Sequence, residues 1–400
     1  MMKLFSRNKN YILMHKNIPV LTGSYSPESH QFQDIEEVVN SAHLPVGVRK
    51  NDSVSLKRLN YWFMRRSIPG YRVGLAQFLN KLSVAHPMDL IEYTHAVSLS
   101  DTYWLKKENE ECTWETVNFF HHSYAQNAFG KAMFSSFNEK ADEKVCYTPN
   151  NNTAGFHRKA WMKRDGQFYL LKGGYPFYQM EPVNEWLASQ LAHTIGADSL
   201  AYETEVYENA LVSVCPCFTD ENTDLVTAEM ILMECNKKEN DNDLSLYVEE
   251  LKKHGIHDAE SRLSDQMVLD YIMMNTDRHA QNMGVLVDAN TLVWKQTAPV
   301  FDTGTSLACL VDDSEILSSD RLEECTLLNK RNIPFDTLLE YINFQKYDFT
   351  DVLDLPREYG NRLVRYQPVT HISDDRIEAA YTLFYKRLLK IRKLQKQMLR

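Results

Sequence analysis

The chain has 400 residues and a formal net charge of -10 at pH 7, with 44% hydrophobic and 24% charged residues. These shares are ordinary for globular proteins and exclude wholesale disorder, a collagen repeat and a coiled coil. At roughly 150 residues per domain, the length predicts two or three domains. An acidic chain lacks the broad basic surface that nonspecific nucleic-acid binding uses, so we do not expect nucleic acid as its main partner.

The distribution of apolar residues and cysteines indicates the compartment. The opening residues contain no apolar run long enough for a signal peptide. A membrane span needs about 18 consecutive apolar residues, which the sequence does not contain, so no membrane association is expected. The 7 cysteines are few for this length and odd in number. They favour reduced thiols in a cytoplasmic protein.

The first third of the chain, residues 1–144, mixes short extended pieces with turn-rich stretches. No clean helical or strand period runs through it. We therefore expect an N-terminal accessory α+β module. A regulatory protein partner is the interaction that we consider for this module.

The next part, residues 145–238, is expected to form a β-rich nucleotide-binding N-lobe. Asp165 and Gly166 separate two apolar runs, and this pair is typical of a two-residue hairpin turn. Residues 181–198 repeat apolar side chains at helical spacing and stop near a glycine, so a helix is expected there. A second hairpin is expected over 201–218.

The remainder, residues 239–400, is expected to form a helical catalytic C-lobe. Apolar residues recur at helical spacing in several stretches. Ser373 is a plausible N-cap for the last of them, with two aspartates in its first turn. Helices are expected at 243–255, 261–275 and 373–400, and short strands at 284–288 and 291–295.

The stretch 275–306 contains a combination of residues that suits phosphoryl transfer. Asp277 stands five residues before Asn282, and Asp302 follows twenty residues later, before Thr303 and Gly304. Such a reaction needs one carboxylate that orients and deprotonates the attacking hydroxyl, and an amide and a second carboxylate that hold magnesium. Each residue alone is common in polar turns. Their order on a predicted helix, loop, hairpin and loop is typical of kinases.

The N-lobe offers a matching ion pair. Lys172 ends an apolar strand, and Glu185 lies thirteen residues later on the expected helix. Kinases use such a pair to hold the lysine against the phosphates of ATP. Alone, a strand-end surface lysine and a solvated glutamate would be the commoner interpretation. The downstream Asp277, Asn282 and Asp302 favour the functional one.

These motifs resemble those of the HipA-like kinase family, bacterial serine/threonine kinases named after the toxin of a toxin–antitoxin pair. NTDRHAQNMG and APVFDTGTS resemble the catalytic and metal-binding motifs of the family, and NTAGFHRK resembles its phosphate-binding loop. FYLLK and NEWLASQLAHTIGA resemble its lysine strand and glutamate helix. The resemblance covers roughly residues 145–310. It implies a two-lobed, protein-kinase-like α+β fold and ATP- and magnesium-dependent transfer to a Ser or Thr hydroxyl of a protein substrate.

The resemblance implies a role for each matching residue of the catalytic segment. Asp277 would be the catalytic base, and His279 would accompany it and support the loop. A satisfied structural histidine is an equal interpretation of His279. Asn282 and Asp302 would bind Mg²⁺.

On the nucleotide side, the resemblance implies that Lys172 contacts the ATP phosphates and that Glu185 positions Lys172. Gly155 and Lys159 would belong to the phosphate-binding loop. By composition alone that loop is a weak signal, because it contains one glycine and fits neither a Walker A loop nor a GxGxxG loop.

The strand at 212–218 would meet the adenine of ATP, with backbone groups near Cys215 and Cys217 bonding the base. A metal site at this Cys-x-Cys pair is disfavoured, because no second cysteine or histidine pair completes four ligands. The chain departs from the family at Asn152, where toxin-type members carry a self-phosphorylating serine. Thr153 is adjacent, so autophosphorylation stays open.

Two other functions remain open at this level. A small-molecule kinase acting on an antibiotic, a sugar or a lipid headgroup would need the same carboxylates and amide. A pseudokinase that binds a partner would retain the fold without turnover. The presence of all the catalytic residue types argues against the pseudokinase, and the resemblance favours a protein substrate.

Overall fold

The computed structural model describes residues 9–122, 124, 126–134, 147–153, 155–238, 241–313, 315–316 and 324–400. The chain folds into two compact units. The first unit comprises Met1–Phe168, Cys217–Asn240 and Val285–Lys295, and the second comprises Tyr169–Pro216, Asp241–Gly284 and Gln296–Arg400. Both units are therefore assembled from segments that are separated in the sequence. The expected domain boundaries at 144 and 238 stay a prediction.

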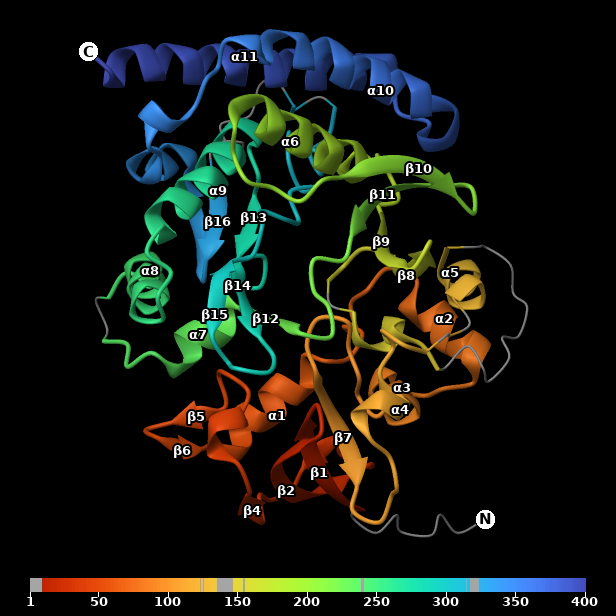
Figure 1. The fold of residues 1–400 in the computed structure, drawn as a ribbon. Coiled ribbons are helices and arrows are strands. Elements are labelled where there is room, and N and C mark those ends of the chain that lie inside the picture. Colours follow the sequence, from red (N-terminus) through yellow and green to blue (C-terminus); the bar gives the residue numbers. More distant parts are fainter. Residues whose placement is uncertain are drawn as a thin grey trace. The chain divides into compact units, whose positions relative to one another are not determined.

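The first unit contains short strands and helices (Figure 1). In chain order its elements are β1 (Lys9–His15), β2 (Ile18–Ser26), β3 (Gln31–Phe32), β4 (Glu37–Val38), η1 (Ser41–His43), β5 (Arg49–Lys50), β6 (Ser53–Val54), α1 (Leu56–Met64), α2 (Leu75–Leu82), α3 (Pro87–Tyr93), β7 (Tyr103–Lys107), α4 (Trp114–Val117), α5 (Gln126–Phe134), η3 (Pro149–Asn152), β8 (Lys159–Arg164), β12 (Thr223–Thr227) and α7 (Ala228–Glu234). Two further strands, β14 (Gly284–Asp288) and β15 (Trp294–Thr297), lie at the edges of its last segment.

The sheet of the first unit has the strand order β3-β2-β1-β7, and β4 also pairs with β2. These pairings are antiparallel. Apolar side chains of β1 and β2 share one buried cluster with the aromatic side chains Trp62 and Phe63 of α1. Met230 of α7 joins the same apolar cluster. This core therefore ties the segment 217–240 to the N-terminal sheet.

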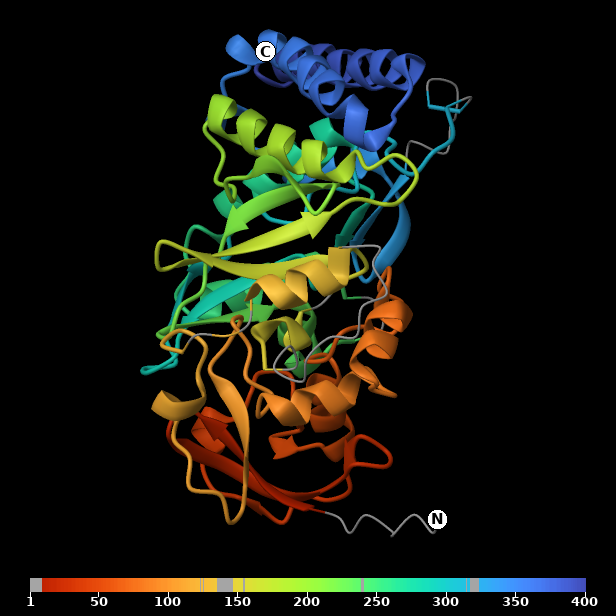
Figure 2. The same cartoon turned by 90° about the vertical axis from the view of Figure 1, so that its right-hand side faces the viewer.

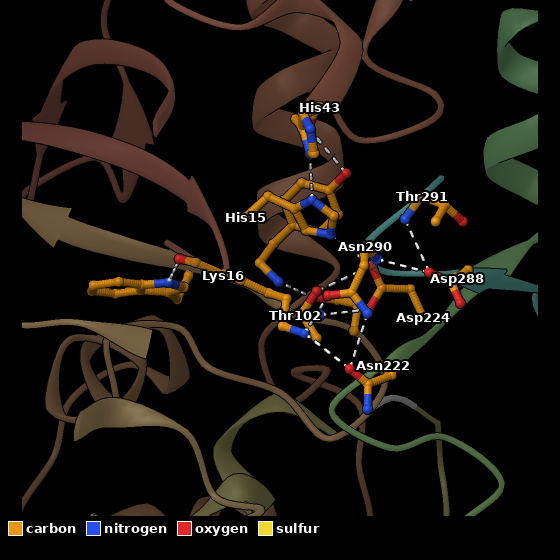
Figure 3. A network of polar contacts seen from close by, with 12 residues as sticks. His15, Lys16, His43, Thr102, Asn222, Asp224, Asp288, Asn290 and Thr291 are labelled. Carbon is orange, nitrogen blue, oxygen red and sulfur yellow. Dashed lines mark hydrogen bonds and ion pairs between the residues drawn. The ribbon is translucent and has the colours of Figure 1, made fainter. Parts of the chain in front are cut away.

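A buried polar network makes a second connection between distant segments of the first unit (Figure 3). His15 is fully buried, and its Nε2 lies 3.0 Å from Oδ2 of Asp224. The other ring nitrogen of His15 lies 2.8 Å from Nδ1 of His43. The backbone N–H of Thr102 donates to Asp224 Oδ1 at 2.8 Å. Buried polar groups are costly unless paired, so this network specifies how the segments meet.

The second unit carries a smaller sheet and most of the long helices (Figure 1). Its elements are β9 (Gln167–Gly173), which begins at the end of the first unit, α6 (Glu181–Ile195), β10 (Glu203–Tyr207), β11 (Ala210–Pro216), α8 (Asp243–Lys253), α9 (Ala259–Met273), β13 (Asp277–His279), β16 (Glu324–Leu328), β17 (Lys330–Pro334), η5 (Phe335–Tyr341), η6 (Phe344–Lys346), η7 (Asp351–Asp354), α10 (Leu355–Thr370) and α11 (Asp374–Met398).

Strand β11 lies between β9 and β10, and both pairings are antiparallel. Helix α6 packs against β10 and β11 and also contacts α9 and α10. Helices α10 and α11 pack against each other along one side of the unit (Figure 2). Nearly all of α6 is buried, because it has protein on several sides.

Several local predictions are confirmed. Asp165 and Gly166, which join β8 to β9, both have positive φ, as a two-residue hairpin turn requires. Helix α6 ends at Gly196 in the left-handed conformation. Ser373 caps α11 by accepting a hydrogen bond from the N–H of Arg376. The helices expected at 243–255 and 261–275 are α8 and α9.

The strand expected at 291–295 begins later, at Trp294. The Asp288 carboxylate accepts hydrogen bonds from the N–H groups of Asn290 and Thr291, and these bonds stabilise a turn. The turn is therefore longer than the sequence suggested. Among the described residues, no helix has the length and apolar character needed to cross a membrane.

Candidate active site

The ammonium of Lys172 lies between two carboxylates of the second unit. Lys172 Nζ donates to Oε1 of Glu185 and to Oδ1 of Asp302. Lys172 and Glu185 are buried, whereas the Asp302 side chain is 26% exposed. Burial alone would lower the pKa of Lys172, but Asp302 and Glu185 outweigh it and raise that pKa above its ordinary value. The lysine is therefore charged at any physiological pH.

The strand pairing brings Glu185 and Lys172 together. Lys172 of β9 is opposite Ser213 of β11, and the Ser213 hydroxyl donates to Oε2 of Glu185 on α6. Glu185 thus has one oxygen on the lysine and the other on the serine. Because a fully buried carboxylate needs such donors, Ser213 contributes to holding the pair in place. Sequence reasoning found Lys172 and Glu185 but gave no sign of Ser213.

Asp302 has a left-handed backbone, with φ of +56°, which is uncommon for a residue other than glycine. Its N–H donates to the hydroxyl of the buried Tyr202 at 3.2 Å. Two residues later, a Cβ on Gly304 would lie 3.1 Å from Cβ of Glu181 and 3.2 Å from Cγ of Glu185. Because of this close approach to α6, a side chain at Gly304 would require its neighbours to move by a few tenths of an ångström.

The loop after α9 holds Asp277, His279 and Asn282 close to one another. The side-chain amide of Asn282 donates to the backbone carbonyl of Asp277 at 3.0 Å, and its N–H donates to the carbonyl of His279 at 2.9 Å. His279 Nε2 lies 3.8 Å from Asp277 Oδ2. The Asp277 side chain is half-exposed.

Electrostatics also distinguish Asp277 from an ordinary surface aspartate. Burial of the carboxyl group raises its pKa, and the nearby Asp302 acts in the same direction. His279, Arg278 and Lys172 act in the opposite direction, and the net pKa is raised. A carboxylate with a raised pKa is better suited to accept a proton.

Arg278, within the same loop, is buried and makes a two-pronged ion pair with Asp270 of α9. Its Nε and Nη2 donate to the two oxygens of Asp270 at 2.7 and 2.9 Å. Its Nη1 donates to the carbonyls of Asn282 at 2.7 Å and Phe301 at 2.8 Å. One guanidinium therefore links α9, the end of the catalytic loop at Asn282 and the residue before Asp302. Sequence reasoning missed Arg278 and Asp270, which resemble ordinary polar residues of a loop and a helix.

The residues matched to the phosphate-binding loop lie in the first unit. Lys159 is buried at the start of β8, and Gly155 has a φ of +98°. Arg72 is buried and forms hydrogen bonds to the same loop. It donates to the Thr153 hydroxyl at 2.7 Å, to the Thr153 carbonyl at 2.5 Å and to the Gly155 carbonyl at 3.1 Å. Burial lowers the pKa of Arg72 to about 9. Sequence reasoning missed Arg72 as well.

The three asparagines before Gly155 are also buried. Asn150 accepts from the N–H of Trp161, Asn151 donates to the carbonyl of Leu90, and Asn152 donates to the carbonyl of Val97. The loop is therefore anchored to β8 and to the segment around α3 by side chains as well as by its backbone.

The two cysteines expected near adenine fall in different units. Cys215 is buried in β11 of the second unit, and its thiol donates to the carbonyl of Leu170 at 3.9 Å. Cys217 belongs to the first unit, where its thiol lies 3.1 Å from the hydroxyl of Thr219. Neither belongs to a group of potential metal ligands among the described residues. Their proposed contact with adenine stays a prediction.

The donor set of the second unit fits magnesium. Asn282 uses its side-chain nitrogen for Asp277, which leaves the amide oxygen as its coordinating atom. Asp302 supplies carboxylate oxygens, and such hard oxygen ligands are the kind that magnesium prefers. The negative charges of Glu185, Asp302 and Asp277 outnumber the positive charge of Lys172. A divalent cation would neutralise it.

Comparisons with known proteins identify the family of the chain. The family model described as HipA-like C-terminal domain matches residues 151–359. Among solved structures, the chain is similar to a complex of Shewanella oneidensis MR-1 described as toxin–antitoxin system HipA, HipB and its operator DNA. The identity is 10%, the TM-score is 0.54, and the match covers 95% of this chain and 97% of that one.

A second similar structure is the Helicobacter pylori proinflammatory kinase CtkA. Its identity is 19% and its TM-score is 0.42, with 59% of this chain and 88% of that one covered. No curated protein sequence matches the chain.

The family match extends over more than half of the 400 residues. The likeness to the Shewanella structure extends over almost the whole chain and bears out the expected kinase-like α+β fold. The family that the sequence motifs indicated is thereby confirmed. The chain belongs to the HipA-like kinase family.

Proposed function

We propose that this protein is a kinase that transfers the γ-phosphoryl group of ATP to a Ser or Thr hydroxyl of a protein substrate, with magnesium as its metal. The observation that carries the proposal is the position of Lys172 between Glu185 and Asp302. The same unit holds Asp277 and Asn282 on a loop that Arg278 fixes. Together these are the groups that phosphoryl transfer requires.

In this mechanism Lys172 binds phosphate oxygens of ATP, and Glu185 keeps the ammonium in place. Asn282 and Asp302 would hold magnesium, which supplies positive charge that neutralises the phosphates. Asp302 and the ATP phosphates therefore compete for the same ammonium, and the buried Glu185 is the partner that stays. Gly155 and Lys159 of the first unit are proposed to belong to a phosphate-binding loop.

Asp277 would act as the base. Its carboxylate orients the acceptor hydroxyl and takes its proton as the oxygen forms a bond to the γ-phosphorus and the bond to the ADP oxygen breaks. The raised pKa of Asp277 favours this proton transfer. His279, 3.8 Å from the carboxylate, would help to orient it.

The acceptor is proposed to be a protein, and the first unit is proposed to bind a regulatory protein. The Shewanella structure was solved with HipB and operator DNA. The net charge of -10 makes direct DNA contact by this chain unfavourable, so a protein partner is the better candidate.

The proposal is tested by incubating the protein with ATP, magnesium and a cell lysate as the source of acceptors. Phosphosite mass spectrometry then identifies the residues that receive phosphate. Wild type and Asp354→Asn should label the same Ser or Thr sites, because Asp354 is an exposed surface carboxylate of the same unit. Asp277→Asn should lose labelling by about 1,000-fold or more while keeping the wild-type circular dichroism spectrum. Equal labelling by Asp277→Asn would refute the assignment, and labelling of small molecules alone would show a different acceptor.

A further inference from the structure

A cluster of metal-ligating side chains lies in the first unit, and none of its members has a role in the proposed phosphotransfer mechanism. His95, Glu110 and Cys112 each offer a ligand atom, and these atoms all lie within 4.8 Å of one another. It is the single such group found in the part of the chain that the structure describes. Each of the three residues is partly buried.

The backbone brings the three residues together from two distant segments. His95 lies in the tight turn after α3, and the N–H of Leu105 in β7 donates to its carbonyl at 2.7 Å. Just beyond the end of β7 the chain turns, and the N–H of Glu110 donates to the carbonyl of Lys107 at 3.0 Å. This turn places Glu110 and Cys112 back beside His95.

Two of the ligands are already in contact. Nε2 of His95 lies 2.9 Å from Oε1 of Glu110, and the second oxygen of Glu110 accepts from the N–H of Lys107 at 3.4 Å. The Trp104 ring stands nearly perpendicular to the imidazole, with centroids 6.2 Å apart, and limits its rotation. The Cys112 side chain packs against the apolar cluster that contains Trp104. The first coordination sphere is therefore largely preorganised.

The donor atoms indicate which metal fits. A thiolate, an imidazole and a carboxylate together match zinc, which accepts sulfur, nitrogen and oxygen in a tetrahedral arrangement. Tetrahedral zinc places ligand atoms about 3.3 to 3.6 Å apart, which the observed separations can reach with small side-chain movements. Magnesium and calcium disfavour the sulfur and nitrogen donors.

We propose that His95, Glu110 and Cys112 form a zinc site in the N-terminal unit, with water in the fourth position. Two negative ligands would balance the dipositive ion. The ion would join the turn after α3 to the loop after β7.

The test uses the full-length protein without a histidine tag, stripped of metal and titrated with zinc and with cobalt as its spectroscopic substitute. Wild type should bind one ion, and the cobalt form should show thiolate charge-transfer absorption in the near ultraviolet. Cys112→Ser should abolish that absorption, and both Cys112→Ser and Glu110→Gln should weaken zinc binding by about 10-fold or more. Cys235→Ser and Glu111→Gln are the matched controls and should behave as wild type.

Circular dichroism and thermal unfolding of the metal-free variants establish that each one folds. Absence of the charge-transfer band in wild type would overturn the proposal. So would its persistence in Cys112→Ser, or an equal loss in Cys235→Ser. Since the readouts are metal stoichiometry and absorption, the result does not depend on kinase activity.

Discussion

The buried pair of Asp270 and Arg278 gives a prediction that separates stability from catalysis. Asp270→Asn keeps the size of the side chain but removes the charge that balances Arg278. Both side chains are 1% exposed, so the guanidinium would remain buried without a counter-charge. Breaking a buried ion pair in this way costs about 3–5 kcal/mol.

Urea unfolding measures this loss. With a urea dependence of about 3 kcal/mol per molar, a loss of 3–5 kcal/mol lowers the unfolding midpoint by roughly 1–1.7 M. Hydrogen exchange of peptides from α9, measured at rising urea concentrations, assigns the transition to the second unit. A midpoint lowered by less than about 0.3 M would refute the reasoning, because it would mean that Arg278 is not held as a buried charge.

The double variant Asp270→Leu with Arg278→Met distinguishes the effect of the ion pair on stability from its effect on phosphate transfer. Replacing both charges by apolar side chains should restore most of the stability, since the desolvation cost disappears with the pair. Phosphate transfer should stay low, because Arg278 also donates to the carbonyls of Asn282 and Phe301. Recovery of wild-type activity along with stability would show that the carbonyl contacts do not position the catalytic loop.

Three further substitutions test other contacts. Burial raises the pKa of Glu181 to about 7. At neutral pH the folded protein therefore holds a proton on Glu181 that the unfolded chain releases. The unfolding free energy should fall by about 3 kcal/mol as the pH rises from about 4.5 to 8. Glu181→Gln should remove this pH dependence, measured by urea unfolding. Ser213→Ala leaves one oxygen of the buried Glu185 without its donor and should lower the unfolding free energy by about 1–3 kcal/mol. Arg72→Lys removes contacts to the loop at Thr153 and should raise the KM for ATP by about tenfold with a smaller change in kcat, measured by steady-state kinetics.

Local patterns were sufficient for several elements in both units. The hairpin at Asp165 and Gly166, the helix that ends at Gly196 and the cap at Ser373 depend on neighbours in the sequence, and each is present. The spacing of Lys172 and Glu185 also suggested their contact, because a strand followed by a helix packed on the same sheet brings these positions together. Their roles in catalysis stay predictions.

Other features depend on contacts between distant residues and have no local signal. Arg66 is one example: it is buried and donates to the carbonyls of Ala96 and Tyr103 and to Asp101. Its partners lie 30 to 37 residues away in the sequence. An arginine that will be buried is indistinguishable in sequence from one that stays in water, because the deciding groups are backbone carbonyls elsewhere in the fold.

Arg66, Arg72, Arg278 and Arg376 share this arrangement, since each is buried and each donates to carbonyls of irregular segments. A guanidinium has five donors in a fixed plane and keeps its charge, so it can satisfy several carbonyls that no strand or helix pairs. The segments held in this way include those around Thr153 and Asn282, to which we assign phosphate and metal binding. Loss of activity on substitution of such an arginine therefore does not identify a catalytic residue. The assignment of Asp277 requires the additional observation that Asp277→Asn keeps the loop and the fold intact.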